Sequence, residues 1–190
     1  MQHGQGTSEI EQGSSQAQEG EAKDDRGQPV DKGEREARRL SGLRILVDAD
    51  ACPVKEEVYR VALRREVPVK VVSNMRLRVP DHPLIERVLV SDKFDAADDW
   101  IAEAADARTV VITGDILLAD RCLKAGATVI GHNGKPFTVA SIGSAIATRA
   151  IMADLRAGGD VVGGPAPFAK ADRSRFLQAL DEALVRLERS

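Results

Sequence analysis

Five aspartates of this chain lie beside short apolar segments that predict strands or helices; they are Asp48, Asp50, Asp95, Asp98 and Asp115. Carboxylates that are brought together repel each other, and near neutral pH they stay ionised only beside a compensating cation. Mg²⁺ and Mn²⁺ take hard oxygen ligands of this kind and activate water for phosphoryl chemistry. We therefore predict a catalytic cluster of all five aspartates, with Asp48, Asp98 and Asp115 as ligands of Mg²⁺ or Mn²⁺.

Polar and basic residues near the same segment ends are candidates for substrate contacts. They are Ser73, Asn74, Arg76, Arg78, Lys93 and Thr113. Side chains of these types bind phosphate oxygens without reading a base sequence. Aromatic residues make up only 3% of the chain, which argues against recognition by base stacking. The expected partner is RNA, held mainly through its phosphates.

Each of these residues also has a purely structural interpretation. Asp50, Asp95 and Asp115 precede predicted helices, where aspartate is a favoured N-cap, and Asp98 lies in a first turn, where the helix dipole favours a carboxylate. The basic residues could equally belong to a solvated loop. Asp48 differs, because it ends an apolar strand too early to cap the next helix and needs a partner if it is buried. Asp48 is therefore the strongest single functional candidate.

Other chemically versatile residues give weaker signals. Cys52 is interpreted as a small residue in a tight turn, because no histidine base is placed near it. His82 and His132 lie in predicted loops without the spacing of metal ligands, and we expect both to be solvated. Trp100 and Phe94 are expected to be core or lid residues.

The elements that must position these residues alternate between strands and helices. Strands are expected at 43–47, 67–72, 88–90, 109–112 and 127–130, and helices at 54–65, at 96–107, up to Lys124, at 139–157 and around the stripe formed by Phe176, Leu180, Leu184 and Leu187. Short runs of Val, Ile and Leu between helices predict an α/β fold with a mostly parallel sheet sandwiched by helices and a helical C-terminal third. In the common doubly wound strand order the first and fourth strands are neighbours, and ligands bind at the carboxyl ends of the strands.

Composition divides the chain into two parts. Residues 1–42 contain nine acidic and six basic residues and only seven apolar ones, so we expect a disordered polar tail. Of the 30 acidic and 27 basic residues in the whole chain, 21 of each remain in residues 43–190, which form a neutral single domain. No run of about 18 apolar residues is present, so we expect no membrane span. A polar start and two distant cysteines indicate a cytoplasmic protein.

Four strings, in chain order, resemble a known family: ILVDADACPVKEEVYRVA, FDAADDWIAEAA, VVITGDILLADRCLKAGATVIG and GGPAPF. They resemble the YaiI/YqxD family of uncharacterised bacterial proteins, from Leu43 to the last helix but not over 1–42. The resemblance implies a PIN-like, NYN-related α/β sandwich, a Rossmannoid fold in which strand-end acids bind divalent metal for RNA cleavage. It places the strand-one acid at Asp48, the helix acids at Asp95 and Asp98, and the strand-four acid at Asp115.

The same resemblance leaves Asp50 without a settled role and contains two departures from the family pattern. Leu117 stands where the family string usually has proline, which affects only the start of a helix. Residues 131–135 read GHNGK in place of an NPRG-like string, so no substrate-binding arginine is inferred there.

Two other functions remain open at this stage. Haloacid-dehalogenase-like phosphatases also begin with a strand-end DxD motif, in which Asp48 would attack phosphorus and Asp50 would act as acid and base. Ser73 and the pair Asp115 and Asp120 would fit the later motifs of that group. The second alternative is a non-catalytic module that binds RNA or a protein partner.

Overall fold

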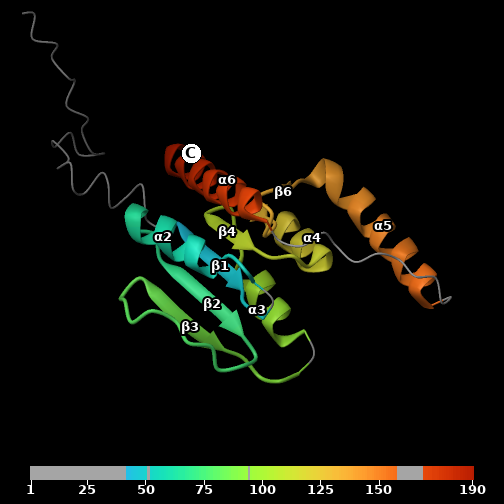
Figure 1. Ribbon diagram of the computed structural model, residues 1–190, viewed down its shortest axis with the longest axis horizontal. Helices are drawn as coiled ribbons and strands as arrows, with labels where there is room; N and C mark the ends of the chain where they lie inside the picture. Colours follow the sequence, from blue (N-terminus) through green and yellow to red (C-terminus); the bar gives the residue numbers. More distant parts are fainter. Residues whose placement is uncertain (1–41, 51, 94, 158–168) are drawn as a thin grey trace, which may run out of the picture. The chain divides into compact units, whose positions relative to one another are not determined.

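The computed structural model describes residues 42–50, 52–93, 95–157 and 169–190, all of which belong to one compact unit. Their helices and strands follow the α/β alternation expected from the sequence (Figure 1). The predicted tail lies outside the described residues except for Gly42, as do Phe94 and the GGPAPF segment at 163–168. No helix of the described part is both long and apolar enough to cross a membrane.

Six strands form one mostly parallel sheet in the order β3-β2-β1-β4-β5-β6. They are β1 (Arg44–Asp48), β2 (Val69–Ser73), β3 (Ile85–Leu89), β4 (Thr109–Ile112), β5 (Thr128–Ile130) and β6 (Pro136–Phe137). The first five pair in parallel, and β6 pairs antiparallel with β5. The central place of β1, between β2 and β4, confirms the predicted neighbourhood of the first and fourth strands.

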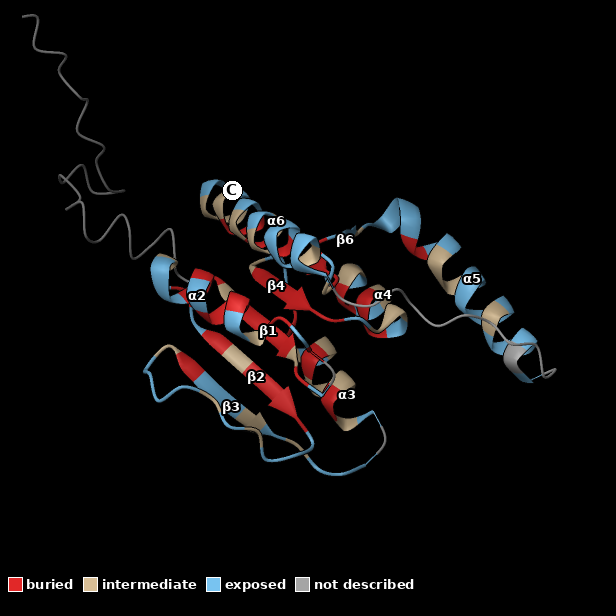
Figure 2. Cartoon of the chain, viewed as in Figure 1, coloured by how far each residue is buried: buried red, intermediate tan, exposed pale blue. Residues whose placement is uncertain are grey.

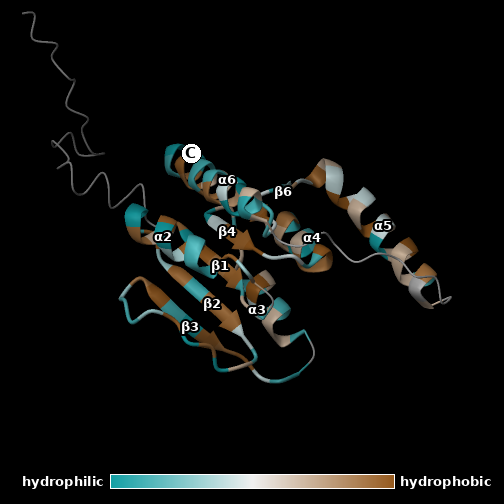
Figure 3. Ribbon diagram, in the orientation of Figure 1, coloured by the Kyte–Doolittle hydropathy of each residue, from teal (hydrophilic) through white to brown (hydrophobic). Residues whose placement is uncertain are grey.

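Helices cover both faces of the sheet. On one face α2 (Lys55–Arg65) and α6 (Lys170–Arg189) share a core with the strands, and on the other face α3 (Ala96–Ala104) and α4 (Ile116–Lys124) do so. The nineteen-residue α5 (Val139–Ala157) contacts α4. The buried residues of the strands and of the inner helix faces appear red in Figure 2, and the strands are largely hydrophobic in Figure 3.

The side chains of β1 alternate between the two faces of the sheet. Ile45 and Val47 are buried with α2 and α6, whereas Leu46 is buried with α3 and α4. Since side chains of a strand alternate between its faces, Asp48 continues on the side of Leu46. Burial of each such aliphatic side chain stabilises the fold by roughly 1.5–3 kcal/mol. The hydrophobic pattern of β1 thereby also directs its terminal aspartate toward α3 and α4.

Three elements differ most from the sequence-based expectation. The helix expected at 96–107 ends at Ala104. The third strand spans Ile85–Leu89 rather than 88–90, and β6 was not expected at all. Strand β6 has only two residues and contains Pro136, which lacks a backbone N–H and weakens any strand signal. Its pairing with β5 depends on the tight turn that brings it back, not on its own composition.

The turn before β6 lies so close to helix α6 that a larger residue in the turn should destabilise the fold. A Cβ added at Gly134, which has φ of 76°, would lie 2.6 Å from the backbone of Arg175 and Phe176. We expect Gly134→Ala to lower the free energy of unfolding by about 2–5 kcal/mol, because left-handed strain and overpacking add. Gly143→Ala is the matched control, since a Cβ there meets nothing within 4 Å. Equal urea midpoints for the two variants would contradict this packing.

Candidate functional site

Asp48 and Thr113 are joined at the carboxyl edge of the sheet. Val47 and Ile112 are register partners in the parallel β1–β4 pair, so the residues that follow them are adjacent. The Thr113 hydroxyl, fully buried, donates a 2.8 Å hydrogen bond to Asp48 Oδ2. Burial is the main cause of a raised pKa at Asp48, and the neighbouring charges of Asp50 and Asp115 raise it further against the opposing effect of Thr113.

Asp115 is the N-cap of α4, as its structural interpretation predicts. Its Oδ1 accepts hydrogen bonds from the backbone N–H groups of Leu117 at 2.7 Å and Leu118 at 3.1 Å. Its own backbone N–H donates to Thr113 Oγ1 at 2.9 Å. Capping does not remove Asp115 from the site, because its charge raises the pKa of both Asp48 and Asp98. The capping bonds instead hold this carboxylate in place.

Asp98 faces the same edge from α3. Burial, followed by the charges of Asp48, Asp115 and Asp95, raises its pKa to about 6. The next residue, Asp99, is exposed and pairs with Arg121 at 2.8 Å. The helical-face argument for Asp98 over Asp99 is therefore confirmed, since Ala97 and Ile101 bury the face that carries Asp98 inward.

A cleft of about 270 Å³ opens beside these aspartates. It is lined by Asp50, Asn74, Asp92, Lys93, Asp95, Ala96, Ala97 and Asp98. Asp50 does not cap α2, whose N-cap is Val54, and its Oδ1 accepts a 2.6 Å hydrogen bond from the buried Ser73 hydroxyl. Asp95 occupies the N-cap position of α3 at φ of 63° without a side-chain capping bond. The cleft is therefore lined by residues that follow β1 and β2, by the β3–α3 connection and by the first turn of α3.

Some predicted contacts lie elsewhere. Arg76 and Arg78 are exposed in the loop after β2 and do not line the cleft. Another basic residue, Lys70 in the middle of β2, which was not among the predicted contacts, pairs with Glu86 at 3.0 Å and lies 5.8 Å from the centre of the Trp100 ring. Trp100 packs against the core of the α3–α4 face, as expected.

His132 is a site residue that the sequence interpretation missed. It is half-buried rather than solvated, and its ring lies 3.2 Å from the position that a Cβ on Gly114 would take. Its Nε2 is buried and has no hydrogen bond to the described residues. Burial lowers the pKa of the ring against the opposing charge of Asp48. The strand-end rule could have found it, because His132 follows β5, the neighbour of β4.

The remaining versatile residues agree with their structural interpretations. His82 is exposed, and its Nδ1 accepts a hydrogen bond from the Leu84 backbone N–H at 3.2 Å. Cys52 is buried, which raises the pKa of its thiol to about 11. A thiol with that pKa stays protonated and inert at neutral pH.

The donor atoms of the edge suit a hard divalent cation. Asp48, Asp98 and Asp115 offer carboxylate oxygens, and Asp98 accepts no hydrogen bond from the part of the chain that is described. Their spacing is wider than a coordination shell, however: among the described residues no three His, Cys, Asp or Glu side chains are grouped closely enough to hold a metal ion. Binding would therefore have to draw the carboxylates together.

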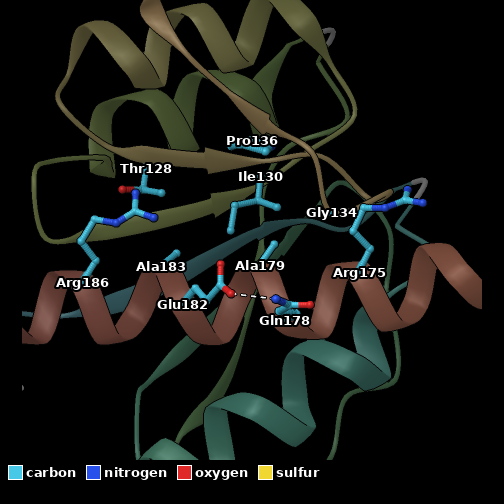
Figure 4. A pocket seen from close by; sticks show the side chains of 10 residues that line it. All are labelled: Thr128, Ile130, Gly134, Pro136, Arg175, Gln178, Ala179, Glu182, Ala183 and Arg186. Carbon is cyan, nitrogen blue, oxygen red and sulfur yellow. Dashed lines mark hydrogen bonds between the residues drawn. The ribbon is translucent and has the colours of Figure 1, made fainter.

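A second pocket of about 270 Å³ lies between α6 and the β5–β6 region (Figure 4). Its apolar floor includes Ile130, Ala179 and Ala183, and the Gln178 amide donates a 2.8 Å hydrogen bond to Glu182 at its rim. This pocket contains none of the predicted site residues. The acidic edge and the α6 pocket are therefore separate features of the molecule.

Comparison with known proteins agrees with the strings that carry the resemblance. A sequence model described as "Uncharacterized BCR, YaiI/YqxD family" matches residues 46–186. The chain belongs to the YaiI/YqxD family. A "UPF0178 protein" of Sphingopyxis alaskensis is 79% identical over 151 residues, which cover 79% of this chain and 98% of that protein.

Other relatives of this YaiI/YqxD chain carry the same description. One from Nitrobacter winogradskyi is 58% identical over 80% of this chain and 96% of its own. Another, from Bradyrhizobium diazoefficiens, is 61% identical over 77% of this chain and 87% of its own. No solved structure matches the chain.

Crowding of the acids predicts a pH-dependent cost in stability. Because the folded-state pKa of Asp98 is raised to about 6 from 3.8, the folded state binds its proton more tightly, and stability is lost as pH rises through that window. In metal-free buffer we expect Asp98→Asn to raise the melting temperature at pH 7.5 and to leave it nearly unchanged at pH 4. Asp99→Asn, on the adjacent exposed residue, should give no such gain. An equal gain at both pH values would contradict the repulsion.

Proposed function

We propose that this protein hydrolyses phosphodiester bonds of RNA, using Mg²⁺ or Mn²⁺ held by Asp48, Asp98 and Asp115. The observation that carries the proposal is that carboxylates at the end of β1, in α3 and at the N-cap of α4 gather at one edge, where burial first and their mutual charges second raise the pKa of Asp48 and Asp98. Such crowding is unfavourable without a cation and favourable with one. The analogy with PIN-like nucleases points to the same chemistry, but fold analogy alone does not assign an activity.

The chain's own residues would prepare this site before an ion binds. Thr113 fixes one oxygen of Asp48, and the first backbone N–H groups of α4 fix one oxygen of Asp115, so each carboxylate keeps a second oxygen for the cation. Asp98, on the rim of the cleft, is the ligand free to turn. When bound, the ion would lower the pKa of water and offset negative charge on the leaving oxygen.

Other residues of the edge would hold the substrate. Lys93 lines the cleft and offers a charge to a phosphate, with Asn74 as a neutral hydrogen-bonding group beside it. Asp50 and Asp95 border the same cleft and complete the acidic set. His132 lies against Gly114 with its Nε2 buried, so its ring would stay beside Asp48 and would not contact the substrate. Arg76 and Arg78 would reach only a longer RNA that extends along the loop after β2.

A second candidate, an aspartate-based phosphatase, is favoured by one contact. The 2.6 Å hydrogen bond from Ser73 to Asp50 places a hydroxyl and a carboxylate next to the strand-end Asp48. In that reaction an Asp48 oxygen would form a bond to phosphorus, the ester P–O bond would break, and Asp50 would protonate the leaving alcohol. Water would then hydrolyse the phosphoaspartate. Trapping of a phosphorylated or fluoroberyllate-bound Asp48 would support this candidate over the nuclease.

Metal binding is the first test of the proposal. We expect Mn²⁺ to raise the melting temperature of the wild type by several degrees, because a ligand that binds only the folded state stabilises it by mass action. Asp48→Asn and Asp98→Asn should lose this increase, whereas Asp99→Asn should keep it. An unchanged response in Asp48→Asn would place any bound ion elsewhere.

Cleavage of RNA is the second test. Purified protein with Mn²⁺ should cut single-stranded or structured RNA, and Asp48→Asn and Asp115→Asn should each lower the rate by more than the roughly 10–100-fold that is typical when a residue only supports a metal ligand. Asp115→Asn needs a stability control, since Asp115 also caps α4; the rate is compared well below the melting temperature of each variant. RNA binding without turnover in any metal would favour a non-catalytic module and oppose the nuclease.

A further inference from the structure

Helix α6 carries large apolar residues on one side and small ones beside them. The large side chains of Phe176, Leu180 and Leu184 are fully buried in the core that α6 shares with α2. The small residues Ala179 and Ala183 stand where the helix faces β5. Because a methyl group cannot reach the strand, a cavity of about 270 Å³ remains between the two elements. The α6 pocket therefore results from alanine at two positions of a helix that is otherwise packed with large residues.

Both walls of this pocket come from regular elements. On the strand side Thr128 and Ile130 are two residues apart in β5 and point to the same face of the sheet. On the helix side the lining residues recur at helical spacing and share one face over three turns; they are Arg175, Gln178, Ala179, Glu182, Ala183 and Arg186. Figure 4 shows the two arginine side chains rising from α6 toward the strands at opposite ends of the pocket.

The Arg175 end of the pocket is held in place. A Cβ on Gly134 would lie 2.6 Å from the backbone of Arg175 and Phe176, so the turn before β6 packs directly on α6. Arg175 Nη1 donates hydrogen bonds to the Asn133 carbonyl at 3.1 Å and to Asp172 Oδ1 at 2.9 Å. These contacts engage the Arg175 charge and fix the helix against the turn. A cavity that is already formed binds a ligand at a lower entropic cost.

The other end carries a cation that is not engaged in this way. Arg186 is exposed, and its guanidinium forms no hydrogen bond or ion pair with the residues that the structure describes. Thr128 lines the same end and offers a hydroxyl. Between the two arginines the Glu182 carboxylate is turned toward Gln178, whose amide donates a 2.8 Å hydrogen bond to it (Figure 4). The charges therefore favour an anion beside Arg186 and oppose a second one farther along the pocket.

We propose that the α6 pocket binds a small organic acid that has one carboxylate and an apolar body. The carboxylate pairs with Arg186, whose planar set of N–H donors matches two carboxylate oxygens. The apolar body lies on Ile130, Ala179 and Ala183. Small-molecule sites are typically of this kind, mainly apolar with a few polar groups that fix the orientation of the ligand. The pocket lies apart from the acidic edge, so this proposal is independent of the nuclease proposal.

Titration of the full-length protein with octanoate, followed by ¹H–¹⁵N NMR, tests the proposal. We expect shifts of backbone amides in β5 and α6 and a dissociation constant of about 1 mM or below, which small ligands of this size reach. The alcohol 1-octanol, which keeps the chain but lacks the charge, should bind at least about tenfold more weakly. Octanedioate should also bind more weakly than octanoate, because its second carboxylate would approach Glu182.

Substitutions in α6 separate the charged contact from the apolar one. Arg186→Gln should raise the dissociation constant of octanoate at least about tenfold, because it removes the charged donor. Arg189→Gln is the matched control: the same substitution at an exposed arginine of α6 that does not line the pocket. It should bind octanoate like the wild type. Ala179→Leu should abolish binding by filling the floor, and its melting temperature establishes that it is folded.

Three results would overturn the proposal. The first is an absence of octanoate binding up to about 10 mM, tenfold above the expected dissociation constant. The second is an equal effect of Arg186→Gln and Arg189→Gln, because the carboxylate would then not pair with Arg186. The third is a set of amide shifts confined to α5, which would place octanoate on the exposed apolar residues of that helix instead.

Discussion

The parallel pairing of β1 with β4 is the constraint on which the rest of the site depends. It brings the residue after Ile112 next to the residue after Val47, and the Thr113 hydroxyl then bonds to Asp48. Parallel strands also end at one edge, so the helices that follow β1 and β4 begin there. Loss of this pairing would separate Asp48 from Asp115 by the whole width of a strand or more. The hydrogen bond between Thr113 and Asp48 forms because β1 and β4 are neighbours in the sheet.

The same arrangement makes the edge electrostatically unfavourable in isolation. Burial and like charges raise the pKa of Asp48 and Asp98, although the hydrogen bond from Thr113 offsets part of the effect at Asp48. A stable fold tolerates this cost because the two apolar cores on either face of the sheet contain over thirty buried hydrophobic residues. Groups of perturbed carboxylates persist in proteins mainly at functional sites, although structural networks can produce them as well.

Helix α5 presents the opposite case. The acidic edge is a set of polar groups brought together at a cost, whereas α5 joins the core through Ile142 and Ile146 and leaves the apolar Val139, Ile151 and Leu155 exposed. The two features lie on different elements of the fold.

Much of the fold could be predicted from the sequence, because its strands are short, continuous runs of Val, Ile and Leu that are typical of buried parallel strands. The fourth strand and α5 were predicted with their observed limits, and the helical period correctly chose Asp98 over Asp99 as the inward residue. The sequence also determined the family, through strings that extend along the domain. These are local properties, set by side-chain type and spacing.

Only the tertiary structure decided which of the candidate residues meet. Strand β6 has only two residues, and the limits of the five-residue β3 depend on its pairing with β2, so neither could be predicted from local composition. His132 was expected to be solvated because it lies in a loop, yet the adjacency of β4 and β5 places it over Gly114 beside Asp48. Arg76 and Arg78 follow β2 closely in sequence, as Asn74 does, but they do not line the cleft that Asn74 lines. Residues that are close in the sequence need not be close in space. The order of the strands in the sheet decides which of them meet.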